Sequence, residues 1–223
     1  MLTKRVQDTE EESWISVSDL MSGLMMVFLL IAIIYAKNNQ KQVVEWVNVE
    51  EEIYQALVAE FKDDLSDWQA EIERDTLTIR FMSPEMLFAR GSDELQDRFK
   101  SILNDFFPRY VRLLASRFPK DISEVRIEGH TSSEFGALPS ADAFLKNMEL
   151  SQDRTISVLK YSFGLREVTL HNKWMREHIT ALGLSSARLI LQDGEENRIK
   201  SRRVEFAIRT NTKDVLLRLL GSN

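Results

Sequence analysis

The sequence predicts an α+β protein that begins with a single transmembrane helix, continues into a linker helix and ends in one folded domain of helices and strands. Three observations support this. The run from Val17 to Ala36 has no charged residue except Asp19, the stretch 38–75 has apolar residues spaced by three or four, and alternation of polar and apolar residues begins at Thr76. The predicted parts are an N-terminal tail at 1–13, a transmembrane helix at 14–37, a linker helix at 38–75, a folded domain at 76–210 and a C-terminal tail at 211–223.

The composition limits the classes of function. With 223 residues, 43% of them hydrophobic and 29% charged, the chain has room for one membrane span and one domain of ordinary size. A net charge of −6 disfavours binding to nucleic acid. The absence of cysteine excludes disulfides and thiolate metal sites, and three histidines are too few to favour a multi-histidine metal site. No phosphate loop, dinucleotide glycine pattern or catalytic triad order occurs, so we expect neither an enzyme nor a cofactor.

The apolar run is long enough to span a membrane, since about 20 residues of helix cross a hydrocarbon core of about 30 Å. Acidic residues precede it and no small-residue cleavage pattern follows Tyr35, which predicts an uncleaved anchor rather than a signal peptide. The basic residues on its two sides are nearly balanced. Charge alone therefore does not determine which end lies in the cytoplasm.

Asp19 is the first functional candidate. A carboxylate at the edge of such a span costs about 2.5–3.5 kcal/mol on insertion scales, so it requires a partner, a wet cavity or a role. In a helix, Asp19, Ser22, Gly23 and Met26 share one small, partly polar face, which suits close packing against other membrane helices. The alternative is that Asp19 caps the helix at the headgroup level, and spacing leaves both interpretations open.

The linker stretch predicts a long amphipathic helix that pairs with a second copy as a short coiled coil, although Glu50 interrupts the apolar seam. The pattern of alternating and helix-spaced apolar residues after Thr76 predicts a small α+β domain with its helices on one face of a sheet. Its expected elements are a strand at 76–81, a helix at 93–117, a strand at 125–131, a helix at 147–163, a loop-and-helix excursion at 165–184, a short helix at 185–191 and a strand at 203–209.

Three motifs in this domain resemble the landmarks of the OmpA-like peptidoglycan-binding family, in its usual order. They are Val125-Arg-Ile-Glu-Gly-His-Thr131, Asn147-Met-Glu-Leu-Ser-Gln-Asp-Arg154 and Ser201-Arg-Arg-Val-Glu205, preceded by a similar opening turn at Phe88–Leu95. The resemblance covers about residues 76–210 and implies an OmpA-like α/β sandwich domain that binds peptidoglycan.

The resemblance also implies a binding site. The family holds the free carboxylate and amine of a diaminopimelate stem peptide between an Arg, here Arg154, and an Asp after the strand-end Thr. Ser132 occupies that Asp position, so either Glu134 or Asp142 substitutes for it or binding is weak. Without the resemblance, Arg154 would be interpreted as a surface arginine paired with Glu149 or Asp153, and His130 is expected to shape the loop. The full set of implied wall-binding residues is Thr131, Ser132, Asn147, Leu150, Arg154, Arg202 and Arg203.

Together with the membrane segment, the domain resembles the MotB class of stator subunits, and within it the ZorB family of the Zorya anti-phage defence systems. The resemblance implies an inner-membrane subunit of a proton-driven motor, with a cytoplasmic N-terminus and a periplasmic domain. Asp19, assisted by Ser22, would carry the ion, with sodium as the alternative to the proton. The implied partners are a MotA-like (ZorA-like) multi-span protein in a five-to-two complex, a second copy of this chain and peptidoglycan. A flagellar MotB-like subunit and a passive tether are the alternative functions.

Overall fold

The computed structural model describes residues 2–211, with side chains at 18–37 and 49–211. It consists of two units, residues 1–48 and 49–223. The described part of the first unit is helical throughout and belongs to α1. Most of the predicted C-terminal tail, and the side chains of the linker at 38–48, lie outside the described residues.

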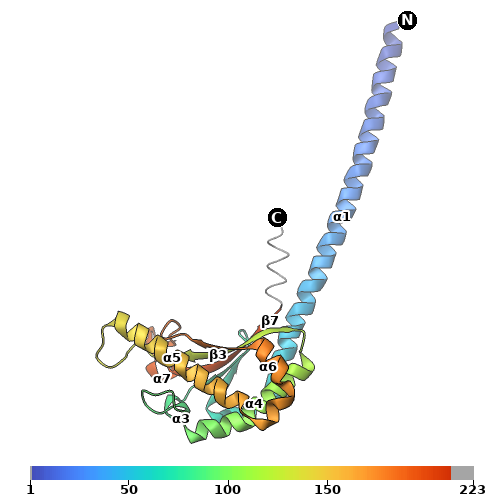
Figure 1. Ribbon diagram of the computed structural model, residues 1–223. Coiled ribbons are helices and arrows are strands. Elements are labelled where there is room, and N and C mark those ends of the chain that lie inside the picture. The colour runs from blue at the N-terminus through green and yellow to red at the C-terminus, as the bar shows by residue number, and fades with distance from the viewer. Residues whose placement is uncertain (1, 212–223) are drawn as a thin grey trace. The chain divides into compact units, whose positions relative to one another are not determined.

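The second unit contains the end of α1 and all the other elements (Figure 1). In chain order the elements are α1 (Leu2–Phe61), α2 (Leu65–Trp68), β1 (Ala70–Glu73), β2 (Thr78–Phe81), α3 (Pro84–Leu87), α4 (Asp97–Arg117), β3 (Ile122–His130), α5 (Ser140–Phe163), the 3₁₀ helix η1 (Arg166–His171), α6 (Asn172–His178), β4 (Ile179–Gly183), β5 (Leu191–Gln192), β6 (Glu195–Glu196), α7 (Arg198–Ser201) and β7 (Arg203–Thr210).

Five strands form one sheet in the order β1-β2-β7-β3-β4. The β3–β4 pair is parallel and the other neighbours are antiparallel. Glu128 of β3 lies opposite Glu205 of β7, and Glu205 lies opposite Arg80 of β2. Because successive side chains of a strand point to opposite faces, this register collects charged residues on one face and apolar residues on the other.

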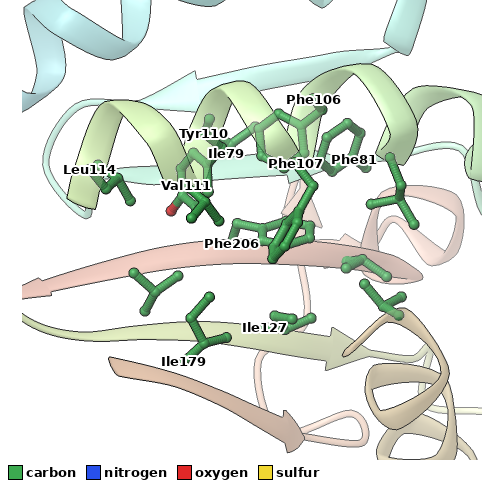
Figure 2. Packing of buried hydrophobic residues seen from close by; sticks show 14 of the residues in the cluster. Ile79, Phe81, Phe106, Phe107, Tyr110, Val111, Leu114, Ile127, Ile179 and Phe206 are labelled. Carbon is green, nitrogen blue, oxygen red and sulfur yellow. The ribbon is translucent and has the colours of Figure 1, made fainter. Parts of the chain in front are cut away.

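The apolar face of the sheet carries the core. Figure 2 shows Phe106, Phe107 and Tyr110 of α4 pointing toward Phe206 of β7. The Phe206 ring lies 5.0 Å from the ring of Phe106 and 5.9 Å from those of Tyr110 and Phe81, with steep interplanar angles, and it is fully buried. Such edge-to-face pairs add about 0.5–1.5 kcal/mol each beyond their burial. The predicted arrangement of helices on one face of the sheet is therefore present.

The linker helix is shorter than the sequence predicts. The helix α1 ends at Phe61 rather than near residue 75, and its last turns bury Ile53, Leu57 and Phe61 in the core of the domain. After α2, Gln69 adopts a left-handed conformation with φ 51°, which reverses the chain into β1. The spacing of apolar residues by three or four, which continues through Leu65, Trp68 and Ile72, predicts helix at residues 70–73. Pairing with β2 makes these residues a strand in spite of that pattern.

The second half of the domain differs from the predictions in three places, although the excursion at 165–184 contains the expected helical turns in η1 and α6. The excursion at 165–184 contains a strand, β4, at the edge of the sheet, and residues 185–188 form turns rather than a helix. The strand β4 has only five residues and is only partly buried, so it lacks the alternation that marks the other strands. The second long helix begins at Ser140, seven residues earlier than predicted, so Asn147 and Arg154 both lie well inside α5.

Candidate functional site

Asp19 lies well inside a long helix. The helix α1 begins at Leu2, so Asp19 is more than four turns from its start and cannot cap it. Ser18–Lys37 is the one candidate membrane span among the described residues, and every side chain in it is exposed on the isolated chain. No described side chain bonds to Asp19, and a Cβ added at Gly23 would meet nothing within 4 Å. The face that includes both residues is therefore free to pack against another chain.

In the folded domain, α5 lies unusually close to the ends of β3 and β4. A Cβ at Gly129 would be 2.7 Å from the carbonyl oxygen of Ser151, and one at Gly183 would be 2.4 Å from the backbone nitrogen of Gln152. Only glycine permits this approach. Two hydrogen bonds secure it: the Gly183 N–H donates to Gln152 Oε1 at 2.7 Å, and the Gln152 amide donates to the Ala181 carbonyl at 3.3 Å. The close packing brings Arg154, one turn further along α5, to the end of the sheet.

Arg154 has no carboxylate partner among the described side chains, so the interpretation that it pairs with Glu149 or Asp153 is wrong. Its Nε donates to the Ser92 carbonyl at 2.9 Å, and its guanidinium lies 4.8 Å from the centre of the Phe88 ring. Burial lowers the pKa of Arg154 to about 10, and repulsion from Arg202 adds to the effect. The guanidinium is still charged at neutral pH, and its terminal nitrogens have no partner among the described residues. These are the properties of an anion-binding group.

The two adjacent arginines have different roles. Arg203 is buried, with Nε 2.6 Å from Glu205 Oε1 and Nη1 donating to the carbonyls of Arg188 and Ser201. It is fully engaged inside the protein. Arg202 donates only to the Arg198 carbonyl, at 3.2 Å, and forms no ion pair in the described part of the chain. Of the two predicted binding arginines, Arg202 is thus available to a ligand, and the geometry argues against Arg203.

Both available arginines line a cavity at the end of β3, together with Gly129, His130, Pro84, Leu87, Phe88, Arg203 and Val204. The cavity has a volume of about 10 Å³, which is about the space of one water molecule. A peptide therefore cannot enter it as it stands. A ligand would have to bind at its surface or displace a lining side chain such as that of Arg202.

The other predicted residues build the loop that follows β3. The Asn147 side chain donates to the carbonyls of Ser132 and Glu134 at 3.0 and 3.1 Å, and the Thr131 N–H donates to the Ser185 carbonyl at 2.9 Å. Leu150 is half-buried one turn before Arg154. Asn147 thus holds the loop in place, and no contact points to a ligand.

Neither predicted substitute for the missing Asp is suited to that role. Glu134 forms an ion pair with Arg198 at 2.7 Å, and the neighbouring Ser133 donates to Glu196 from both its N–H and its hydroxyl. Asp142 is exposed in the first turn of α5, twelve residues before Arg154 and therefore about 18 Å from it along the axis.

No pattern in the sequence predicts the buried charged cluster that lies on the face of the sheet opposite the hydrophobic core. His130 Nε2 lies 3.5 Å from Glu205 and 3.8 Å from Glu128, and all three side chains are at most 8% exposed. The pKa of Glu205 would be raised by burial, but His130 and Arg203 outweigh that effect and hold it well below its ordinary value. The strand register, which no local pattern reveals, brings the three residues together.

The three donors of this cluster are close enough together to ligate a metal ion. Four arginine side chains, however, lie 2.6–3.6 Å from the two carboxylates, and they supply the compensating positive charge. A divalent cation would have to bind against them. The chemistry of the cluster therefore fits a structural ion-pair network. The arginines are Arg80 and Arg203 beside Glu205, and Arg188 and Arg209 beside Glu128.

Comparison with known proteins gives one close relative and several structural neighbours. The chain is 45% identical over 216 residues to the Zorya protein ZorB of Escherichia coli, and the match covers 93% of this chain and 92% of that protein. No protein-family model matches the chain.

Among solved structures, a MotB-like protein of Desulfovibrio vulgaris is 25% identical with a TM-score of 0.53, over 75% of this chain and 98% of that one. The cell wall anchor of the type VI secretion system from Pseudomonas aeruginosa is 22% identical with a TM-score of 0.47, over 69% and 96% of the two chains. The predicted fold class, an apolar N-terminal helix followed by a mixed domain of the MotB and OmpA-like type, is confirmed.

Proposed function

This chain belongs to the ZorB family of Zorya proteins, and we propose that it is the wall-anchored, stator-like subunit of a proton-driven motor complex in the inner membrane. The motor would act in defence against phage. The role is not enzymatic, because the energy comes from an ion gradient. The name of the relative supports the Zorya system, and the structural neighbour supports the MotB-like architecture.

The observation that carries the proposal is the position of Asp19. A carboxylate on a lipid-exposed face of a membrane helix is expensive, so this face should be covered by protein. The fitting partner is a multi-span membrane protein of the MotA (ZorA-like) type, five copies around two copies of this chain. In such an interface, low polarity favours the neutral acid, whereas water access favours the carboxylate. Asp19 would bind a proton on one side and release it on the other, with Ser22 one turn away.

The opposite end of the chain would hold the complex in place. Arg154 and Arg202, which have no carboxylate partner among the described residues, are suited to the free carboxylate of a peptidoglycan stem peptide. In this arrangement the N-terminus is cytoplasmic, Asp19 lies near the inner end of the span and the folded domain is periplasmic. In this proposal, two copies of the chain pair through the membrane helix and the periplasmic domain.

Replacement of Asp19 tests the motor. We expect Asp19→Asn to assemble with its membrane partner but to abolish protection in a phage plaque assay, because the amide cannot exchange a proton. The control is Ser18→Ala, which changes a neighbouring polar residue and keeps the acid. Full protection by the Asn variant would show that the chain is a passive tether. Proton and sodium are distinguished by whether protection requires sodium in the medium.

Replacement of Arg154 tests the wall anchor. We expect the full-length Arg154→Ala protein in detergent to lose most of its co-sedimentation with purified peptidoglycan sacculi. The matched control is Arg166→Ala, which removes an exposed arginine from η1. Equal sedimentation of wild type and Arg154→Ala would remove Arg154 from the binding site.

A further inference from the structure

The strand β4 forms one edge of the five-stranded sheet, and its sequence does not protect that edge. The segment Ile179-Thr-Ala-Leu-Gly-Leu184 has no charged residue and no proline. An uncharged, largely apolar strand with a free edge is a template for pairing with a strand of another chain. The opposite edge strand, β1, carries Glu71 and Glu73 within four residues, and charges on a short edge strand discourage such pairing. The edge at β4 therefore needs another form of protection.

The register of β4 shows which of its backbone groups face outward. The Leu184 N–H donates to the Gly129 carbonyl of β3 at 2.9 Å, and β3 and β4 are parallel. The backbone groups of successive residues in a strand point alternately to its two sides. The residues whose backbone groups face the free edge are therefore Ile179, Ala181 and Gly183.

The side-chain amide of Gln152 occupies this edge. Its nitrogen donates to the Ala181 carbonyl at 3.3 Å, and its Oε1 accepts from the Gly183 N–H at 2.7 Å. In a parallel sheet, one residue of a strand donates to the carbonyl of one residue on its neighbour and accepts from the N–H two positions later. The single carboxamide of Gln152 thus forms the pair of hydrogen bonds that an additional parallel strand would form.

Two further contacts extend the closure to both ends of the strand. The Ile179 N–H donates to the Met175 carbonyl of α6, and the Ser185 N–H, just after β4, donates to Ser151 Oγ at 3.0 Å. The backbone of α5 can come this close because the residue at position 183 is glycine. Side chains of α5 and the end of α6 therefore satisfy outward backbone groups along the whole strand.

We propose that the Gln152 carboxamide closes the free edge of β4 against the addition of a strand from a second copy of this domain. The closure does not depend on peptidoglycan binding. It matters most if two copies of the chain pair in one membrane complex, because each edge then meets the other at a high effective concentration. Gln152 thereby keeps the two folded domains from joining edge to edge at β4.

The test compares the wild type with Gln152→Met, which keeps the length of the side chain but removes its amide. Full-length protein in detergent is measured by sedimentation velocity over a wide range of concentration. We expect one sedimentation coefficient for the wild type and progressively larger species for Gln152→Met. In hydrogen–deuterium exchange, the segment 179–184 should exchange about fivefold faster in the variant, because a lost hydrogen bond is worth about that factor.

Two further variants separate edge pairing from other causes of association. Gln192→Met places the same new side chain on the exposed strand β5 and should sediment like the wild type. Thr180 is exposed on β4, so Thr180→Lys adds a charge to the opened edge. Combined with Gln152→Met, it should restore the sedimentation coefficient of the wild type, because a charged edge strand resists pairing.

Three results would overturn the proposal. If Gln152→Met keeps the sedimentation coefficient of the wild type at every concentration, the amide does not block strand addition. If the larger species persist in the double variant with Thr180→Lys, the contact between copies lies away from β4. If exchange of the segment 179–184 is unchanged in Gln152→Met, the amide does not close this edge.

Discussion

The close approach of α5 to the sheet can be tested by Gly183→Ala. A Cβ at this position would be 2.4 Å from the Gln152 nitrogen and 2.7 Å from its Cα, both backbone atoms that no rotamer change can move. The helix must retreat by about 1 Å to restore normal contact, and such overpacking costs about 1–3 kcal/mol. The two hydrogen bonds of the Gln152 side chain would stretch as well, at about 1 kcal/mol for each one lost.

We therefore expect Gly183→Ala to lower the free energy of unfolding by about 2–4 kcal/mol, or about 4–16 °C in the thermal midpoint. The assay is urea denaturation of the full-length protein in detergent, followed by tryptophan fluorescence. Because Arg154 moves with α5, peptidoglycan binding should weaken too. The control is Gln152→Ala, which removes the same hydrogen bonds without the clash and should cost about 1–2 kcal/mol. An unchanged denaturation midpoint for Gly183→Ala would show that α5 does not pack this closely on β4.

Two other predictions concern the charged residues of the domain. Arg203→Ala leaves the buried Glu205 with one fewer partner and should destabilise the protein by about 3–5 kcal/mol in a denaturation experiment. Arg202→Ala should change the stability by less than about 0.5 kcal/mol, but it should weaken co-sedimentation with the cell wall. The same denaturation midpoint for both variants would contradict these assignments. The second prediction is that the folded domain is sensitive to acid. Glu205, Glu128 and Glu124 each have a lower pKa in the folded than in the unfolded protein. Their contribution to the free energy of unfolding is therefore complete above the ordinary pKa of 4.5 and is lost progressively as the pH falls below that value. Unfolding curves from pH 7 to pH 3 measure this, and a flat profile would contradict it.

The family motifs of this chain were readable because each is local. Gly129, Arg154 and the Arg202-Arg203 pair stand in short, ordered segments, and the strands at 78–81 and 203–210 have alternating polar and apolar residues over most of their length, although the structure buries nearly all of them on both faces. The errors occurred where tertiary contacts override local preference. The apolar spacing that runs through Ile72 predicts helix where β1 forms, and β4 is missed because a short edge strand has little pattern of its own.

The sequence by itself determined the candidate membrane span, the acid within it, the order of the family landmarks and the class of the fold, because these depend on composition and on the periods of helix and strand. Only the tertiary structure decided that Asp19 is too far inside a helix to cap it and that Arg203 pairs with Glu205, whereas Arg202 has no ion-pair partner among the described residues. The physical reason is that a side chain's partners are set by strand register and by helix-on-sheet packing. Strand register and helix packing bring together residues such as Ser92 and Arg154, which are 62 positions apart in the chain. No local sequence pattern encodes that they lie close together.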